Sequence, residues 1–358
     1  MTDSVPNPTT DSAMYTTMHG QPEALQRVLA EGWEPATAAA RLIGRRRVTL
    51  TGIGTSFHAA LVGSWLLRAA GLDARAVSSF DLATYPESYP LGADDAVIVL
   101  AHTGVKRFSG AAMARATAAG ATVLSVGSQT ADHPGSALVL RTTARETSAA
   151  YTASHLAAMT VLAQVATAIG EEAGTAGVAD FREALTALPD LVAGVLAREG
   201  EVLSVAAGAV ERRIYAAAAG PNEATALEAV IKVREAAYGW IDALALEQFL
   251  HGPMVAVNAG DLAILVHVSG AGAARTAEVA AVLDGFGADL WLVGQPVAAI
   301  PEATVFALPD LPETLSPLLA VVPMQLFAYH QAASRGIHPD TFRRDDPVYK
   351  EAFGRITL

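Results

Sequence analysis

The strongest constraint on the fold is a pattern of short apolar runs, each ending at a polar or glycine-containing turn, that occurs twice along the chain. Helical segments separate the runs. The runs of the first half are 47–53, 96–100 and 122–126, and those of the second half are 214–218, 262–266 and 289–293. Apolar runs that alternate with helices are typical of a parallel sheet with crossover helices. The sequence therefore predicts an α/β fold.

The two copies of the pattern are in register. Gly220 lies 166 residues after Gly54, and Gly270 lies 166 residues after Gly104. A constant offset of this kind indicates one α/β unit present twice. A chain of 358 residues also fits two domains better than one. We predict two domains, at 25–175 and 201–335, each with a doubly wound parallel sheet, joined by a linker helix at 176–200.

The two ends of the chain are polar. Residues 1–13 are rich in Pro and Thr and lack the apolar core of a signal peptide, which predicts a flexible tail in a cytoplasmic protein. Residues 336–358 are polar too, and the residues alone favour a disordered end as much as any ordered one. We expect no membrane span, because the most apolar helix, 156–169, contains Gln164 and is shorter than the roughly 20 residues that a span needs.

Charge and composition exclude several kinds of protein. The net charge of −12 argues against nucleic-acid binding. The absence of Cys excludes disulfides, thiolate metal clusters and a Cys nucleophile. No cluster of His, Asp and Glu has the spacing of metal ligands, so we expect no metal and no cofactor.

The stretch 219–253 contains the densest group of candidate catalytic residues. A turn at its start leads into a helix on which Glu228, Lys232 and Glu235 share one side. The spacing allows Lys232 to pair with Glu228 at i+4 or with Glu235 at i+3. The stretch closes on His251-Gly252-Pro253, which predicts a histidine at the edge of a loop.

This combination resembles the second half of the sugar isomerase (SIS) domain pair, as in the isomerase half of glucosamine-6-phosphate synthase without its glutaminase domain. The match rests on Leu227-Glu228, Lys232, Glu235 and His251-Gly252-Pro253, and the resemblance covers most of residues 25–335. It implies two tandem SIS domains with flavodoxin-like strand order. It also implies that the C-terminal tail, 336–358, folds over the sugar as an active-site lid.

The resemblance assigns roles to three of these residues. Glu235 corresponds to the base that moves a proton between C1 and C2 of the sugar, and Lys232 would orient it or contact the substrate. His251 corresponds to the histidine of sugar-ring opening, which can reach the active site of a partner subunit in a homodimer. From the residues alone, Glu235 can instead be an exposed partner of Lys232, and His251 an ordinary loop histidine.

Two polar loops of the first domain follow predicted strands. Ligands of open parallel sheets bind beyond the carboxyl ends of the strands, and helix N-termini there favour anions. The loops read Gly54-Thr55-Ser56 and His102-Thr103-Gly104. We predict that they bind substrate, although Ser and Thr at these positions can also be ordinary N-caps.

The second of these loops departs from the family pattern S-x-S-G-x-T. Ala101 replaces one hydroxyl and Lys106 another, so the loop has gained a cation. Lys106 can hold a phosphate by charge or face the solvent.

Two further segments are candidates by resemblance. The segment 146–152 is similar to the family's E-x-x-V-A-S-T loop beside the sugar, which makes Ala149 and Tyr151 candidate substrate-binding residues. The hydroxyls of this segment can equally cap the helix that follows it. Lys350 is the lysine nearest the C-terminus, and amidating relatives form an imine with the sugar through a tail lysine.

These observations predict an enzyme for a ketose or amino-sugar phosphate. The reaction would be aldose–ketose isomerisation or its deaminating variant, with Glu235 as the base. Two alternatives stay open. One is a regulator that binds a sugar phosphate without catalysis, and the other is a deglycase that cleaves fructosamine phosphates. The expected partners are a small sugar phosphate and a second copy of the chain.

Overall fold

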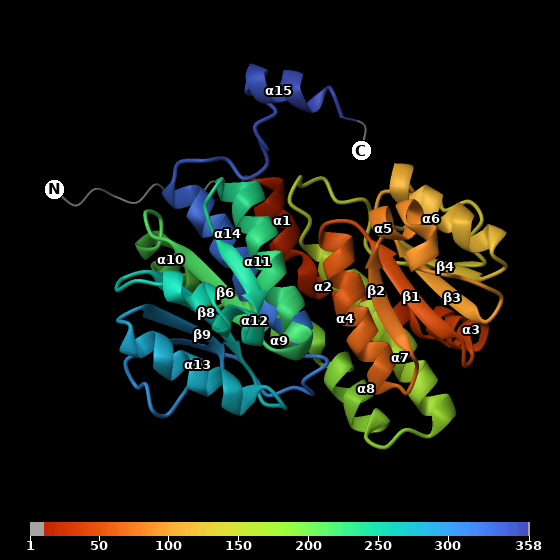
Figure 1. Ribbon diagram of the computed structural model, residues 1–358, viewed down its shortest axis with the longest axis horizontal. Helices are drawn as coiled ribbons and strands as arrows, with labels where there is room; N and C mark the ends of the chain where they lie inside the picture. Colours follow the sequence, from red (N-terminus) through yellow and green to blue (C-terminus); the bar gives the residue numbers. More distant parts are fainter. Residues whose placement is uncertain (1–10, 357–358) are drawn as a thin grey trace. The chain divides into compact units, whose positions relative to one another are not determined.

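The computed structural model describes residues 11–356, which form two compact units. The first domain consists of 20–147, 151–189 and 343–356. The second domain consists of 190–342 together with two short pieces, 11–19 and 148–150. Each unit is built around one five-stranded sheet (Figure 1).

The sheet of the first domain is entirely parallel and has the strand order β2-β1-β3-β4-β5. Its strands are β1 (Arg47–Gly52), β2 (Ala74–Ser78), β3 (Asp95–Leu100), β4 (Thr122–Gly127) and β5 (Leu138–Arg141). The order 2-1-3-4-5 is that of flavodoxin-like folds. The predicted fold class is therefore confirmed for this domain.

Helices cover both faces of this sheet. On one face lie α3 (Trp33–Ile43), α4 (Thr55–Ala69) and α7 (Ala153–Ala173), and α2 (Gln21–Glu31) packs on α7. On the other face lie α5 (Ser79–Thr84) and α6 (Arg107–Ala118). Val97 and Val99 of β3 point into the cluster under α5 and α6, and Ile98 between them faces the opposite layer. Two-sided burial explains why β3 is apolar without alternation.

The second domain repeats this arrangement. Its parallel sheet has the order β10-β9-β8-β6-β7, which is again 2-1-3-4-5 counted within the domain. The strands are β6 (Ile214–Ala218), β7 (Asp242–Ala245), β8 (Leu262–His267), β9 (Asp289–Gly294) and β10 (Thr304–Ala307). The two central strands β8 and β9 each begin 167 residues after β3 and β4. The predicted duplication is confirmed.

The helices of the second domain correspond to those of the first. One face carries α12 (Leu246–Leu250) and α13 (Ala273–Gly285). The other carries α11 (Glu223–Ala237) and α14 (Pro317–Ser334), and α14 also packs on α10 (Glu199–Gly208) and α1 (Ala13–His19). Trp291 of β9 and Phe327 of α14 stack with ring centroids 5.3 Å apart, at the centre of this layer.

One helix differs in length from its prediction. The apolar segment at 156–169 belongs to α7, which runs for 21 residues and is long and apolar enough to cross a membrane. Of its most apolar window, 94% is buried inside the protein. The length expected for this segment was therefore wrong, and α7 is the central core helix of the first domain.

The segments outside the two sheets contain more helix than expected. The predicted linker helix at 176–200 consists of α8 (Val178–Thr186), α9 (Leu188–Leu196) and the start of α10. Short 3₁₀ turns lie at Pro86–Ser88, Gly220–Asn222 and Pro253–Ala256. Of the predicted flexible tail 1–13, residues 1–10 lie outside the described residues. Of the rest, Ser12 is buried and Ala13 begins α1.

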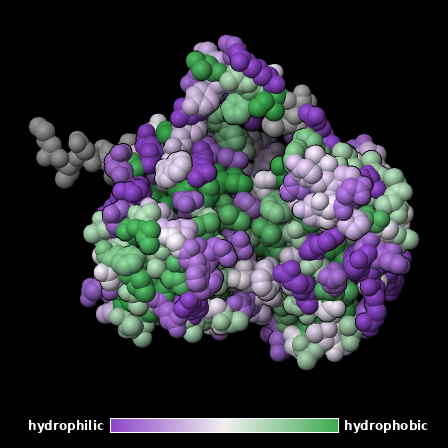
Figure 2. All heavy atoms as spheres, viewed as in Figure 1, coloured by the Kyte–Doolittle hydropathy of each residue, from purple (hydrophilic) through white to green (hydrophobic). Residues whose placement is uncertain are grey.

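The C-terminal tail carries a short helix, α15 (Pro347–Phe353), whose N-cap is Asp346. Val348 and Phe353 of this helix are 74% and 60% exposed, and apolar residues on it are visible at the top of Figure 2. Asp340 anchors the start of the tail. Its carboxylate accepts hydrogen bonds from the first amides of α1 and from the hydroxyl of Ser148.

A half-buried carboxylate holds α1 against the rest of the second domain. Glu199 at the start of α10 lies 3.1 Å from Nε2 of His19 and 2.9 Å from Nε2 of His330. Burial raises the pKa of Glu199, but the hydrogen bonds from His19 and His330 outweigh it and lower the pKa to about 2. The same hydrogen bond raises the pKa of His19 above its ordinary value.

This cluster predicts how stability depends on pH. Because the folded pKa of Glu199 is depressed, its contribution is complete above its ordinary pKa of 4.5 and is lost as the pH falls through the folded value. Because the folded pKa of His19 is raised, its contribution is complete below 6.5 and is lost as the pH rises through the folded value. Glu199→Gln should therefore cost most between these two values, by about 1.5–3 kcal/mol.

Thermal unfolding of wild type and Glu199→Gln across pH 4–9 measures this effect. Glu201→Gln is the matched control, since Glu201 lies on the same helix but pairs with Arg198 at the surface. A Glu199→Gln deficit that does not shrink toward alkaline pH would contradict the role of His19.

Candidate active site

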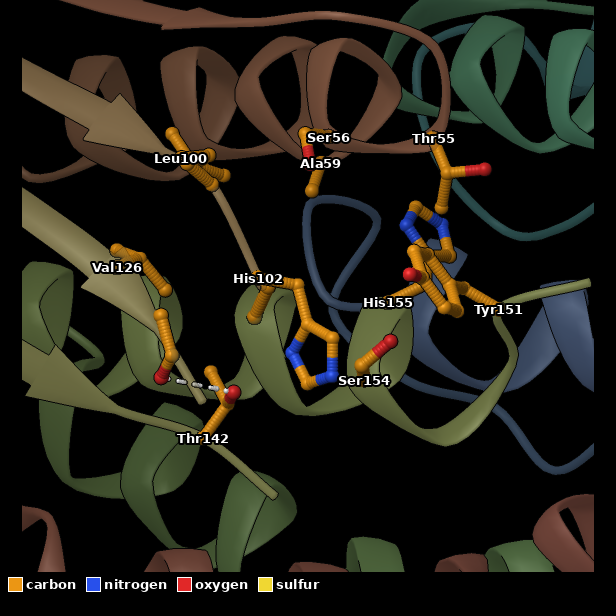
Figure 3. A pocket seen from close by; sticks show the side chains of 13 residues that line it. Thr55, Ser56, Ala59, Leu100, His102, Val126, Thr142, Tyr151, Ser154 and His155 are labelled. Atoms are coloured by element: carbon orange, nitrogen blue, oxygen red, sulfur yellow. Dashed lines mark hydrogen bonds between the residues drawn. The ribbon is translucent and has the colours of Figure 1, made fainter. Parts of the chain in front are cut away.

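The first domain contains a pocket at the carboxyl ends of its strands (Figure 3). Its walls come from the start of α4, the ends of β3 and β4, and the start of α7. The lining residues with polar side chains are Thr55, Ser56, His102, Thr142, Tyr151, Ser154 and His155. The pocket lining carries hydroxyls and imidazoles and no Asp, Glu, Lys or Arg.

Two glycines shape the wall formed by α4. A Cβ on Gly52 would lie 2.6 Å from the backbone of Ser56, so glycine at this position lets the helix begin close to the strand end. Gly54, with φ of 59°, is the N-cap residue of α4. Thr55 and Ser56 are therefore not the N-cap residues that the alternative interpretation required, and both line the pocket.

Glu146 organises the wall formed by α7. Its buried carboxylate accepts hydrogen bonds from the backbone N–H groups of Thr152 and Ser154, at 2.7 and 3.0 Å, and from the hydroxyl of Thr152 at 3.0 Å. This carboxylate takes the place of a side-chain N-cap, and it complements the positive end of the 21-residue helix. It thereby fixes Tyr151 and Ser154 at the pocket.

His102 joins this arrangement from the end of β3. Its Nε2 accepts a hydrogen bond from the backbone N–H of Glu146 at 3.1 Å, and its ring meets the ring of Tyr151 edge-on, with centroids 5.3 Å apart. Figure 3 shows the imidazole extending toward the start of α7. Burial, helped by the positive charge of Arg145, lowers the pKa of His102 to about 4. The ring is therefore neutral at physiological pH.

Four of the residues predicted to bind substrate line the pocket. Thr55, Ser56, His102 and Tyr151 line it. Gly54, Thr103, Gly104 and Lys106 lie in the adjoining loops but are not among its lining residues. Thr142, Ser154 and His155 were not indicated by the sequence, because they reach the pocket through the packing of β5 and α7 rather than through a loop motif.

The cation gained by the second loop lies at the surface. Lys106 is exposed, and its backbone N–H donates to the hydroxyl of Ser109 at 2.8 Å, which orders the first turn of α6. The guanidinium of Arg107 lies over the ring of Phe108, 4.9 Å from its centroid. Of the two interpretations of Lys106, this geometry favours the solvent-facing one.

In the second domain, a side chain of the protein occupies the anion position of the corresponding loop. The backbone N–H groups of Ala271 and Gly272 donate to the carboxylate of Glu313, at 2.9 and 3.4 Å. A Cβ on Gly270 would lie 2.2 Å from the carboxyl carbon of Glu313, so glycine is required there. Glu313 follows Glu146 by 167 residues. The duplicated glutamate thus caps α7 in one domain and fills the anion position before α13 in the other.

The second domain contributes a buried lysine between two carboxylates on α11. The Nζ of Lys232 lies 3.4 Å from Glu228 Oε1 and 2.8 Å from Glu235 Oε2. Lys232 and Glu228 are fully buried, whereas the side chain of Glu235 is 32% exposed. Lys232 therefore makes both of the contacts that the spacing allowed, and it holds Glu235 where α11 meets the solvent.

His251 lies at the C-terminal end of α12 and is exposed. Its Nε2 lies 3.0 Å from Oε1 of Glu247, and Glu247 also binds the guanidinium of Arg275 through both oxygens. Its side chain is 70% exposed, so it is open to contact from outside the chain.

The remaining candidates lie in the loop before α7 and in the tail. Ala149 is half-buried in the piece 148–150, and Lys350 is exposed on α15. Within residues 11–356, no group of three or more His, Asp or Glu side chains could hold a metal ion.

Several known proteins resemble this chain in sequence or in fold. No protein-family model matches the chain. Glutamine–fructose-6-phosphate aminotransferase (isomerizing) from Pyrococcus horikoshii is 26% identical over 326 residues, which cover 89% of this chain and 54% of that protein. The solved C-terminal domain of glucosamine-fructose-6-phosphate aminotransferase from Francisella tularensis superposes with a TM-score of 0.84 at 17% identity, over 92% of this chain and 98% of that chain.

The fold is that of a tandem SIS-domain pair. The resemblance to the SIS family seen in the sequence is thereby confirmed. Glucosamine-6-phosphate deaminase from Thermotoga maritima has the same SIS architecture, with a TM-score of 0.70 at 20% identity over 92% of this chain and 97% of that chain. The chain spans about half the length of the curated relatives that it matches.

The buried pair on α11 leads to a stability prediction. Lys232→Met removes the cation that compensates the fully buried carboxylate of Glu228, which should cost about 3–5 kcal/mol. Adding Glu228→Gln should recover at least about half of that loss, because the uncompensated charge is then gone. Denaturant unfolding measures both, and Lys106→Met, at an exposed lysine, should change stability by less than about 0.5 kcal/mol. A double variant no more stable than Lys232→Met would contradict this account.

Proposed function

We propose that the chain is an enzyme that isomerises or deaminates a sugar phosphate, with Glu235 as the base that moves a proton between C1 and C2. The observation that carries the proposal is the Glu228–Lys232–Glu235 arrangement on α11, in which a buried cation holds a partly exposed carboxylate in one position. The pocket of the first domain supports it as a binding site for an anionic ligand, since hydroxyls and a neutral imidazole line it beside the N-terminus of α4.

The relatives support this reaction class. The curated relatives are isomerizing aminotransferases that act on fructose 6-phosphate, and a deaminase of glucosamine 6-phosphate shares the fold. Aldose–ketose isomerisation and the removal of a C2 amino group begin with the same step, which is the loss of a proton from C2. A single positioned carboxylate therefore serves both reactions.

The proposed substrate is the open-chain form of an aldose phosphate. The carboxylate of Glu235 removes the proton from C2 to give an enediolate, and the resulting carboxylic acid returns that proton to C1. The hydroxyl proton of O2 passes to O1 through water, which completes the ketose. When C2 carries an amino group, the same transfer gives a C2 imine, which water hydrolyses to the ketose and ammonia. Lys232 acts as a positioning residue, because its Nζ at 2.8 Å fixes one oxygen of Glu235.

Glu235→Gln keeps the shape of the side chain and removes its basicity. We expect kcat on the active sugar phosphate to fall by at least about 100-fold, the usual scale of general-base catalysis, with little change in KM. The measurement is turnover of a panel of ketose, amino-sugar and fructosamine phosphates, with analysis of the products. Glu278→Gln, at an exposed glutamate on α13, is the control and should keep full activity. Full activity of Glu235→Gln would remove this residue from the mechanism.

A regulator that binds a sugar phosphate without catalysis is the second candidate. The loop 101–106 favours it, since Ala101 and Lys106 stand where the SIS pattern has hydroxyls. This function predicts saturable binding of a sugar phosphate by the wild type with no turnover of any member of the panel. Turnover that depends on Glu235 would exclude it.

We also propose that the protein is a cytoplasmic homodimer and that His251 serves the active site of the partner subunit. The exposure of His251 supports this, because its side chain is open to a second chain. The tail lysine Lys350 and the remainder of 336–358 would close over the sugar. A monomeric mass in solution at micromolar concentration would contradict the proposed role of His251.

A further inference from the structure

The C-terminal tail leaves α14 through a β-turn at 338–341, which reads His338-Pro339-Asp340-Thr341. The backbone N–H of Thr341 donates to the carbonyl of His338 at 3.2 Å, and this hydrogen bond closes the turn. Pro339 occupies the second position of the turn, where the fixed φ of proline is favoured. The turn is therefore held by its own backbone and by its proline.

Asp340 connects this turn to the loop that leads into the pocket wall. Its carboxylate accepts a hydrogen bond from the hydroxyl of Ser148 at 3.1 Å, and Ser148 is buried. Ser148 follows Glu146 by two residues and precedes Tyr151 by three. Because Glu146 fixes the start of α7 and Tyr151 lines the pocket, the position of this wall depends on where Ser148 is held.

Thr341 connects the same turn to the helix of the proposed base. The hydroxyl of Thr341 donates its hydrogen to the carbonyl of His338 at 2.9 Å. In the contact of 2.7 Å between Thr341 Oγ1 and the phenol of Tyr238, the phenol is therefore the donor. Tyr238 is the C-cap residue of α11, and Glu235 lies in the last turn of that helix. Helix ends open more easily than helix interiors, so this hydrogen bond restrains Glu235.

The backbone of Tyr238 indicates that its side chain has a specific role. Its φ is 51°, in the left-handed region that glycine adopts at little cost and other residues adopt rarely. Helices commonly end on a glycine in this conformation, yet in this chain the glycine, Gly239, comes one residue later. A tyrosine persists in this conformation where other contacts hold it, and the hydrogen bond to Thr341 is such a contact.

We propose that the turn 338–341 is a positioning element for the proposed reaction, with Asp340 setting the pocket wall and Thr341 setting the helix end that carries Glu235. Both are positioning residues, because they act through Ser148 and Tyr238 and not through the sugar. The two contacts come from adjacent residues, so a displacement of the turn changes the wall and the base together. The inference rests on the proposed function for its effect on turnover.

Amide hydrogen exchange of the protein without ligand tests the positioning by itself. Ser148→Ala should accelerate the exchange of the two amides that donate to Glu146 by about fivefold or more, the scale of one hydrogen bond. Tyr238→Phe should accelerate by a similar factor the amide at position 238, which donates to the carbonyl of Val233. Unchanged exchange at these amides would overturn the proposal, as would an acceleration spread evenly over the second domain.

Steady-state kinetics on the active sugar phosphate separate the two contacts. Ser148→Ala loosens the pocket wall and should raise KM about fivefold with little change in kcat. Tyr238→Phe loosens the last turn of α11 and should lower kcat about fivefold with little change in KM. Asp284→Asn, at an exposed carboxylate on α13, is the control and should keep both parameters. Equal changes of both parameters in the two variants would indicate a general loss of structure and overturn the proposal.

Double variants show whether each effect passes through the turn. Thr341→Val added to Tyr238→Phe should lower kcat no further, since either change breaks the same hydrogen bond. Asp340→Ala should raise KM at least as much as Ser148→Ala, and the pair together should raise it no further than Asp340→Ala alone. Additive effects in both pairs would overturn the proposal. Thermal unfolding establishes that the variants are folded, and Ser148→Ala, which keeps the hydrogen bonds of Asp340 to α1, decides the matter if Asp340→Ala is not.

A failure of the proposed function has a different outcome. Wild type that turns over no sugar phosphate would refute the proposed function. The exchange of the local amides would still decide whether the turn positions the wall and the helix end, because that measurement needs no substrate.

Discussion

The buried ion pair of Lys232 is the interaction on which the functional account depends. A lysine with no exposed surface is stable only if its charge is compensated, and Glu228 and Glu235 supply that compensation from the same helix. Because α11 packs along α14 inside the second domain, the position of Lys232 is fixed by the core. The salt bridge from Lys232 therefore holds the partly exposed carboxylate of Glu235 in a fixed position. A flexible surface glutamate would lack the fixed geometry that proton transfer between adjacent carbons requires.

Duplication followed by divergence explains why the two domains differ at the loop after their third strand. Both halves have the same strand order and nearly constant offsets, yet one glutamate of the repeated unit acts differently in each. Glu146 turns its carboxylate onto α7 and leaves the loop after β3 facing a pocket. Glu313 turns its carboxylate onto the loop after β8 and occupies the anion position there. The first domain therefore keeps the open pocket, and the second presents the carboxylate of Glu235.

The central strands and the loops that follow them could be predicted from the sequence because burial on both faces makes them uniformly apolar. The edge strands β2, β5, β7 and β10 could not, since they are four or five residues long and β7 reads only Asp242-Ala243-Leu244-Ala245. Within the site, the i+3 and i+4 pairing of Lys232 follows from helix geometry alone. The contacts of Glu313 and His102 span 41 to 44 residues, so no local pattern indicates them.

The central claim is that Glu235, held by Lys232, moves a proton between adjacent carbons of a sugar phosphate. The most direct measurement is solvent deuterium exchange at C1 of fructose 6-phosphate and at C2 of glucosamine 6-phosphate, followed by NMR in deuterated buffer. Exchange reports enolisation whether or not a product is released. The account predicts exchange into at least one of these sugars with wild type and a loss of at least about 100-fold with Glu235→Gln. No exchange with wild type, or equal exchange in both proteins, would contradict it.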